Sequence, residues 1–351
     1  MLTHSFKLLL PIYILSASSL LILFSINTRL FYLQLMWIIL GNIIILSFKY
    51  IDVRALLNNR EFIFIIYILS IILVFSTLFF SPIRGIKAWI PLGIFALQPV
   101  ELIKISLLLM YAYFFAKKHN SLADIRNIIT PLILLLIPSV IVLNQPDLGS
   151  VLVLFGMWLS FILFSGLTKK HIIIGLILLI LGSFISWGLL ANYQKDRIIG
   201  LFSPESDPLG INYNVIQSKI AIGSSGFLGK GFGQGTQVQL GFLPESQNDF
   251  ILPAFIEEWG LLGGLIIIGA FSFLCREIIN IGVNVAENNF IRFFCLGSVV
   301  ILLIHFTINT GSVLGLLPVI GIPFPFLSYG GSNMLMSFTL IAIINSITTR
   351  V

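Results

Sequence analysis

The chain alternates long apolar runs with short polar connections. Most of these runs are about 17 to 25 residues long, the length that an α-helix needs to cross a hydrocarbon core of roughly 30 Å. The short alternating segments of a membrane β-barrel are absent from the sequence. We therefore expect an all-α polytopic membrane protein that forms a single domain over residues 1–351. About ten spans are predicted, at 6–26, 30–48, 62–80, 100–116, 129–143, 148–167, 172–190, 250–274, 294–310 and a last run ending near 347.

Two segments are too broken by proline and glycine to be spans and too apolar to be plain loops. The first is SPIRGIKAWIPLGIFALQP at 81–99, and the second is LGLLPVIGIPFPFLSYGGS at 314–332. We interpret the first as an interfacial or re-entrant segment, with Trp89 at the level of the lipid headgroups. The second leads into the last span.

One long stretch, residues 192–249, is hydrophilic and separates the seventh predicted span from the eighth. Its second half is rich in glycine, and Lys230 lies in the middle of the glycines. Backbone amides together with one cation can form a cradle for an anion, although glycine-rich loops also occur as simple flexible connections. Asp249 ends this stretch and enters the eighth span.

The composition fits this membrane interpretation. Hydrophobic residues make up 58% of the chain and charged residues 10%, with a net charge of +6. In a membrane protein, a basic excess indicates cytoplasmic loops rather than a nucleic-acid partner. The two cysteines, Cys275 and Cys295, have no metal-ligand spacing, so we expect free thiols.

Basic residues also predict the orientation. With both termini cytoplasmic, the short outer connections hold only Arg29, Arg84 and Lys87. The stretch 192–249 is then a large extracytoplasmic loop. The inner loops and tails would carry Lys7, Lys49, Arg54, Arg60, Lys117, Lys118, Arg126, Lys169, Lys170, Arg276, Arg292 and Arg350.

Ionisable residues inside a bilayer are costly and mark candidate functional sites. Glu101 and Lys104 are three residues apart and share one helix face, either as a functional pair or as a mutually neutralising pair between helices. Asp147 follows Pro146 at a helix start, where a carboxylate can cap free amides. His305 in the ninth predicted span is interpreted as a packing donor rather than a proton relay.

Two further acids, Glu257 and Glu258, lie about two turns into the eighth predicted span. Adjacent helical residues point about 100° apart, so we expect only one of them to face a cavity. Asp249 differs because it lies at the outer interface, beside the glycine-rich loop. Capping of the eighth span by Asp249 is the alternative to a chemical role.

Five ordered motifs resemble the SEDS family, the shape, elongation, division and sporulation proteins. They are QPVELIK at 98–104, QPDLGS at 145–150, DPLG at 207–210, GTQVQLGFLPESQNDFILPAFIEEWGLLGG at 235–264 and GIPFPFLSYGGSN at 321–333. The resemblance spans nearly the whole chain. The run TQVQLGFLPE is more similar to elongation members than to division members.

The resemblance implies a peptidoglycan glycosyltransferase that polymerises lipid II outside the cytoplasmic membrane, working with a class B penicillin-binding protein. The catalytic aspartate of the family aligns with Asp249, although Gln247, Asn248 and Leu252 depart from the common H-T-D-F-I-F pattern. The family's QPSE is QPVE here, and its RRW is KAW at 87–89, which loses a cation.

On these positions we assign Asp249 as the general base that accepts the proton of the attacking sugar hydroxyl. Conversion of an α-linked donor to a β-1,4 bond then needs no covalent intermediate, as in inverting chemistry. Lys104, Arg197 and Lys230 are candidates for binding the leaving diphosphate, with Glu101 positioning Lys104. Asp147 is a further candidate for substrate binding. No cofactor is certain, no metal ligands are assigned, and a divalent cation is left open.

Two rival functions fit parts of the same sequence. A flippase for lipid-linked precursors also has broken helices and intramembrane charges, but it concentrates polar groups near the midplane of the membrane. A scaffold that only supports the cross-linking enzyme would not need Asp249. The crowding of polar residues at the predicted outer surface favours the enzyme.

Overall fold

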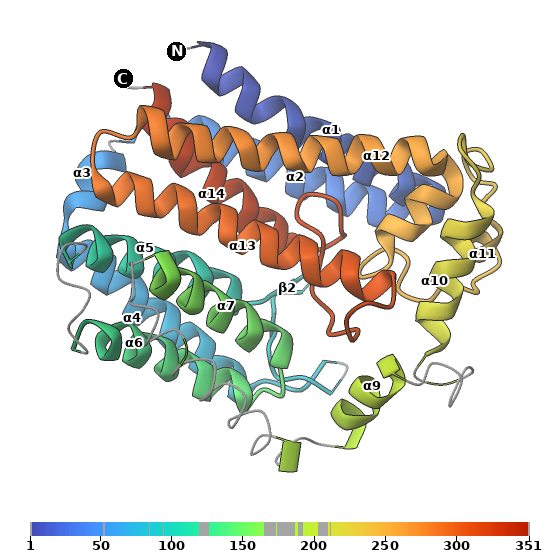
Figure 1. The fold of residues 1–351 in the computed structure, drawn as a ribbon, viewed down its shortest axis with the longest axis horizontal. Helices are drawn as coiled ribbons and strands as arrows, with labels where there is room; N and C mark the ends of the chain where they lie inside the picture. The colour runs from blue at the N-terminus through green and yellow to red at the C-terminus, as the bar shows by residue number, and fades with distance from the viewer. Residues whose placement is uncertain are drawn as a thin grey trace.

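The structure, a computed structural model, describes residues 2–349 except 52, 84, 94, 119–125, 165–172, 174–186, 189–191, 203–209 and 211. This part of the chain is mostly helical and has only two short strands, which confirms the all-α class (Figure 1). The helices are α1 (Leu2–Ile26), α2 (Thr28–Phe48), α3 (Val53–Asn58), α4 (Arg60–Ser76), α5 (Val100–Lys118), α6 (Arg126–Leu143), α7 (Leu148–Phe164), α9 (Asn192–Phe202), α10 (Tyr213–Ser224), α11 (Thr236–Gln239), α12 (Ile251–Asn280), α13 (Asn289–Val313) and α14 (Gly331–Thr349).

Six helical segments among the described residues are long and apolar enough to cross a membrane. Two shorter apolar helices, Ile129–Leu143 and Leu148–Phe164, coincide with the fifth and sixth predicted spans. The seventh predicted span, 172–190, lies almost wholly outside the described residues, so the total of ten spans stays a prediction. The six segments are His4–Ile26, Thr28–Phe48, Arg60–Phe79, Ile251–Val285, Asn289–Val313 and Gly331–Thr348.

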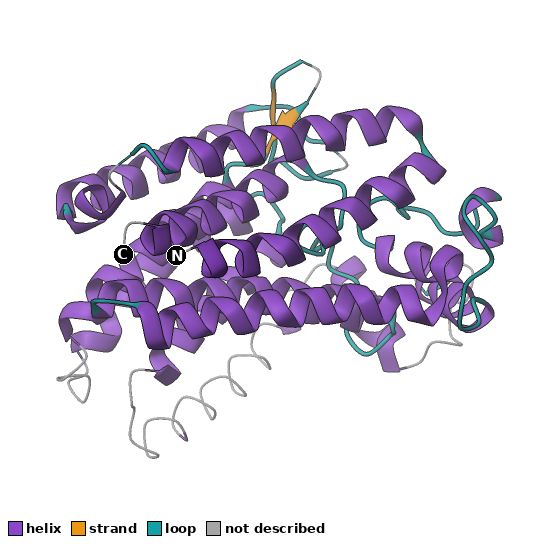
Figure 2. Cartoon of the chain, turned by 90° about the horizontal axis from the view of Figure 1, so that it is seen from above, coloured by secondary structure: helices purple, strands orange, loops and turns teal. Residues whose placement is uncertain are grey.

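The long helices lie side by side and form one bundle (Figure 2). The first helix, α1, packs against α12, and α2 packs against α14. In the other half of the bundle, α13 packs against α5, which also contacts α4. Between α5 and α7, Tyr111 and Phe115 of α5 lie ring against ring with Phe161 of α7, and all three are fully buried.

The two ends of the bundle differ. At one end, Ser5 Oγ of α1 donates a hydrogen bond to Asn345 Oδ1 of α14 (2.7 Å), so the first and last helices meet there (Figure 1). At the other end, Ser25 Oγ of α1 donates to Glu258, and Gln239 Nε2 of the polar stretch donates to Ser25 Oγ (2.8 Å). The polar stretch therefore lies at the opposite end from both termini, an arrangement compatible with the predicted orientation.

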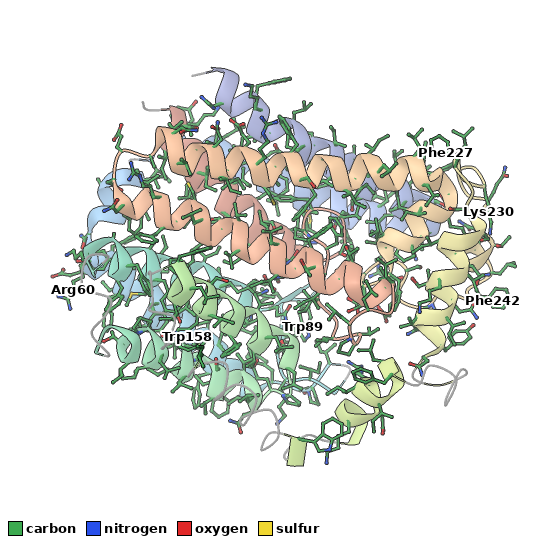
Figure 3. All side chains as sticks on the ribbon, viewed as in Figure 1. Arg60, Trp89, Trp158, Phe227, Lys230 and Phe242 are labelled. Carbon is green, nitrogen blue, oxygen red and sulfur yellow. The ribbon has the colours of Figure 1, made fainter. Side chains whose placement is uncertain are left out.

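The two broken segments take different paths. In the first, β1 (Ile90–Pro91) pairs antiparallel with β2 (Ala96–Leu97), directly after Trp89 (Figure 3). The second segment turns back along α13, because its Pro323 carbonyl lies within hydrogen-bond distance of His305. His305 is eight residues before the end of α13, which corresponds to about 12 Å of helix. The second segment is therefore re-entrant.

A break divides α12 at Gly260, whose backbone angles are φ 73° and ψ −178°. The loop 226–231 of the polar stretch enters this break and exchanges backbone hydrogen bonds with it. The amides of Lys230 and Gly231 donate to the carbonyls of Glu257 and Glu258, each at 3.0 Å. In the same way, the amides of Leu261 and Leu262 donate to the carbonyls of Gly226 and Phe227, each at 3.1 Å. The eighth predicted span is thus two helical pieces rather than one straight helix.

Candidate functional site

Asp249 lies where the polar stretch, α12 and the re-entrant segment meet. The N-cap residue of α12 is Phe250, so Asp249 is one residue ahead of the cap. From α13, Asn309 Nδ2 donates both to the Asp249 carbonyl (3.0 Å) and to the Ile322 carbonyl (2.9 Å). One asparagine therefore fixes the backbone of Asp249 against the backbone of the re-entrant segment. The Asp249 side chain is half-buried.

The turn before Asp249 is also held through its backbone. Ser328 Oγ donates to the Asn248 carbonyl (2.7 Å), and the Tyr329 amide donates to the Gln247 carbonyl (2.9 Å). Positions 247 and 248 are two of those where this sequence departs from the family pattern. Because their carbonyls make these contacts, the altered side chains leave this anchoring unchanged.

A glycine keeps space beside the carboxylate. Gly321 has φ +80°, a conformation that favours glycine. A Cβ atom built there would lie 3.7 Å from Asp249 Oδ2, and apart from Gly321 and its two chain neighbours no other heavy atom of the described residues lies within 4 Å of that position. The carboxylate therefore faces a gap on this side, next to the re-entrant segment.

Glu101 and Lys104 form the predicted ion pair, and Lys104 also contacts His305 of α13. Lys104 Nζ lies 2.7 Å from Glu101 Oε1 and 3.1 Å from His305 Nε2. The three side chains are 4%, 2% and 1% exposed. Since the lysine only donates, His305 Nε2 must accept, and Nδ1 then carries the proton that it donates to the Pro323 carbonyl (3.1 Å). The pair thus supports the re-entrant segment through His305, which agrees with the packing role predicted for the histidine.

Asp147 has the capping role that was the alternative to substrate binding. It is the residue before α7, and its carboxylate accepts from the Ser150 amide (3.0 Å) and from Ser150 Oγ (2.7 Å). The same carboxylate accepts from Gln98 Nε2 (3.3 Å), while the Gln98 amide donates to Ser332 Oγ of α14 (2.9 Å). Asp147 therefore ties together the starts of α5, α7 and α14.

Lys230 belongs to a separate cluster beside the break in α12 (Figure 3). Its Nζ lies 2.7 Å from Glu257 Oε1 and donates to Thr236 Oγ1 (2.8 Å). Glu257 is fully buried, and Glu258, 1% exposed, accepts from Ser25 and Gln239. Residues of the polar stretch hydrogen-bond to both carboxylates, and the expectation that only one of the two glutamates faces a cavity stays a prediction.

Arg197 lies on α9 and reaches the re-entrant segment. Its Nη1 donates to the Val319 carbonyl (2.8 Å). It lines a cavity of about 330 Å³ between α9, α10 and residues 315–319. Lys219 of α10 lines the same cavity, and sequence reasoning did not single it out as a site residue.

The re-entrant segment is the element that connects these residues. It binds Arg197 through Val319, lies beside the Asp249 carboxylate at Gly321, and is linked to the pair Glu101–Lys104 through His305. The residues of α13 that hold this segment are His305, Asn309 and Ser312, the last of which donates to the Pro318 carbonyl (2.9 Å). Their spacing of four and three residues marks one polar helix face within an apolar span, a signal that could have been found in the sequence.

The described part of the chain contains no cluster of metal ligands and no disulfide. No group of three or more His, Cys, Asp or Glu side chains is placed there to hold a metal ion. Cys275 and Cys295 are buried free thiols, as expected.

The comparisons with known proteins agree with these motifs. The sequence matches the family described as the cell cycle proteins FtsW, RodA and SpoVE over residues 2–351. The chain belongs to this family. It is a multi-pass protein of the cytoplasmic membrane, as the apolar helices indicate.

Curated relatives lie in several branches of the family. The peptidoglycan glycosyltransferase MrdB of Escherichia coli K12 is 40% identical over 291 residues, which cover 81% of this chain and 77% of MrdB. A probable peptidoglycan glycosyltransferase FtsW of Trichlorobacter lovleyi is 36% identical over 267 residues, covering 76% of this chain and 69% of FtsW. Stage V sporulation protein E of Bacillus subtilis is 34% identical over 266 residues, covering 76% and 72%.

Solved structures share the fold over nearly the full length. A chain from a peptidoglycan synthase complex, described for its coordination of polymerization and crosslinking, has a TM-score of 0.83 at 27% identity, covering 98% of this chain and 97% of that one. The rod shape determining protein RodA of Thermus thermophilus has a TM-score of 0.70 at 23% identity, covering 98% and 96%. The second likeness concerns the fold alone.

Proposed function

We propose that this chain polymerises lipid II into glycan strands at the outer face of the cytoplasmic membrane during cell elongation, with Asp249 as general base. The enzyme class follows from family membership and from the 40% identity to MrdB: the chain is a peptidoglycan glycosyltransferase. The role of Asp249 is supported by one observation in particular. Its half-buried carboxylate faces the gap beside Gly321, at the end of the bundle where the polar stretch lies.

The proposed reaction is a single displacement. The hydroxyl oxygen of the acceptor sugar attacks the anomeric carbon of the donor, and its proton passes to Asp249. The bond between the anomeric carbon and the diphosphate oxygen breaks, and its electron pair leaves with the lipid diphosphate. General-base assistance of this kind contributes about 10²- to 10⁴-fold to the rate. Inversion at the anomeric carbon needs no covalent intermediate.

Helix polarity supports chemistry on an anionic substrate at this end. Several polar residues lie at helix starts. Asp249 lies close to the start of α12, Gln98 close to that of α5 and Asp147 directly before α7. Gln98 also binds the start of α14. The first turn of a helix carries partial positive charge from its free amides. The start of α12 therefore places partial positive charge beside Asp249, whereas the Ser150 amide at the start of α7 is already bound to the Asp147 carboxylate.

The transporter alternative is less well supported by the charged residues. Lys104 is only four residues into α5, about 6 Å of helix, and it is already paired with Glu101. This charged pair near the start of α5 thus supports the packing of the helices rather than lining a path for a substrate. The scaffold alternative shares one element with this proposal. We infer that a class B penicillin-binding protein is a partner, because a chain of a peptidoglycan synthase complex has the same fold. Unlike a scaffold, however, the proposed enzyme needs Asp249.

Incubation of the purified protein, with its partner, with labelled lipid II tests the proposal. Asp249→Asn should abolish glycan polymer while leaving folding unchanged, because Asn309 and Ser328 hold the backbone of this turn. Glu61→Gln serves as a matched control, since Glu61 is an exposed carboxylate in the first turn of α4. Near-parental polymer from Asp249→Asn would remove the base assignment, and polymer lost equally in both variants would point to general damage.

A further inference from the structure

The cavity between α9, α10 and residues 315–319 contains two cations at the polar end of the bundle. Arg197 and Lys219 line it together with Asn214 and the backbone around Pro318. We propose that this cavity is the subsite for the diphosphate of the lipid carrier, with Arg197 and Lys219 as its binding cations. This inference rests on the proposed function and assigns a place to its leaving group.

The other two candidate cations are committed to carboxylates. Lys104 is 2% exposed and lies 2.7 Å from Glu101 Oε1. Lys230 lies 2.7 Å from Glu257 Oε1, and Glu257 has no exposure to solvent. A diphosphate that took either lysine would leave a buried carboxylate unpaired, which is strongly unfavourable. Lys219, in contrast, is exposed and has no carboxylate within ion-pair distance among the described residues.

The geometry of the cavity wall brings Lys219 close to the backbone. Gly315 has φ +71°, and a Cβ atom there would lie 2.7 Å from Lys219 Nζ. Glycine at this position therefore lets the ammonium group lie against the chain. The Ser218 hydroxyl next to it donates to the Val313 carbonyl (2.7 Å), which anchors α10 to the end of α13. Arg197, which also lines the cavity, donates a hydrogen bond to the Val319 carbonyl.

The cavity is at a suitable distance from Asp249. Val319 lines the cavity, and Gly321 lies beside the Asp249 carboxylate. Two residues of extended chain span at most about 7 Å. A base, an attacking oxygen, an anomeric carbon and a leaving oxygen in line also extend over roughly 7–8 Å, with the reacting atoms about 3–3.5 Å apart. A diphosphate in the cavity would therefore leave the anomeric carbon within reach of Asp249.

Charge in the cavity favours an anion. Asp196 also lines it, so two cations and one carboxylate give a net charge of +1 from these side chains. Diphosphate oxygens are strong acceptors, and guanidinium and ammonium groups bind them through charge-assisted hydrogen bonds. The ligand class is thus a diphosphate ester, rather than a neutral sugar or the polyprenyl tail.

Binding without turnover tests the subsite. Full-length protein carrying Asp249→Asn is titrated with a short-chain polyprenyl diphosphate, with inorganic diphosphate, and with the corresponding neutral polyprenol. Arg197→Ala and Lys219→Ala should each raise the Kd for both diphosphates about tenfold, with unchanged affinity for the polyprenol. Lys219→Arg should retain most of the affinity, because it preserves the charge.

Lys195→Ala is the matched control, because Lys195 is on the same helix α9 but does not line the cavity. Its effect on the Kd should be less than about twofold, because its charge lies outside the cavity lining. Unchanged Kd values in the Arg197 and Lys219 variants, or an equal loss in Lys195→Ala, would overturn the subsite. Because none of the three probes carries a sugar to transfer, the result is separate from the test of Asp249 as base.

Discussion

At the scale of single residues, two buried glutamates of this protein are paired with lysines, whereas the buried Glu258 accepts hydrogen bonds from Ser25 and Gln239. Glu101 and Lys104 form one set, and Glu257 and Lys230 form another. Such pairs cost desolvation energy and contribute little net stability, but removal of one partner is costly. Their contribution here is positional, because His305 connects the first set to the Pro323 carbonyl and thereby to the segment beside Asp249.

Lys104→Met should destabilise the protein by about 3–5 kcal/mol, because it leaves the Glu101 carboxylate buried without its cation. The double variant Glu101→Leu/Lys104→Met should recover most of this loss, since apolar residues of similar size replace the pair. Thermal unfolding of the detergent-solubilised protein measures both. A double variant as unstable as the single one would contradict the explanation. Lipid II turnover is measured in parallel. In the double variant it should recover together with stability, and turnover that stays low would show that Lys104 also contacts substrate.

Contacts within one helix could be predicted from the sequence, whereas contacts between distant segments could not. The spacing of Glu101 and Lys104 was sufficient to predict their ion pair, because both lie on one helix. The contact of Asn309 with the Asp249 carbonyl could not be predicted in this way, because 60 residues separate the two partners. Lys219 was missed for the same reason, since only the fold brings it to Gly315 and the cavity.

At the scale of elements, breaks in the helices create the site. The positions of proline and glycine correctly predicted two irregular segments. The sequence did not predict the path that each segment takes. The first becomes a hairpin through its own strands, whereas the second follows the polar face of α13. The break in α12 was not predicted, because Gly260 occurs in an apolar run that has the composition of a continuous span.

Gly260→Ala tests how strongly this break depends on glycine. The backbone at Gly260 is in a region essentially restricted to glycine, so alanine should cost about 1–3 kcal/mol through the backbone alone. The added Cβ would also lie 2.2 Å from the Phe227 carbonyl oxygen, which adds to the loss. The expected result is a lower thermal midpoint, together with faster proteolysis of the loop 226–231.

Gly269→Ala is the matched control on the same helix. No atom lies within 4 Å of a Cβ atom at Gly269, and alanine in a helix interior is favoured over glycine by roughly 0.5–1 kcal/mol. This variant should be as stable as the parent or slightly more stable. Equal behaviour of the two alanine variants would show that the break tolerates a side chain.

At the scale of the whole molecule, the bundle separates a polar end from an end that carries both termini. Hydrogen bonds between Ser346 and Phe48, and between His4 and Glu277, gather α1, α2, α12 and α14 at the terminal end. Basic residues in the predicted inner loops assign this end to the cytoplasm. The polar stretch and Asp249 would then face outward, where an extracytoplasmic cross-linking partner could receive the glycan strand.

Labelling with a membrane-impermeant thiol reagent in intact cells tests this orientation. The native thiols Cys275 and Cys295 are buried, so the background signal should be low. Phe227, 62% exposed in the polar stretch, and Tyr50, 88% exposed after α2, are suitable positions at the two ends. Phe227→Cys should react in intact cells, whereas Tyr50→Cys should react only after the membrane is permeabilised. The opposite pattern would place Asp249 on the cytoplasmic side, away from any outward-facing polymerisation, and the proposed function would fail with it.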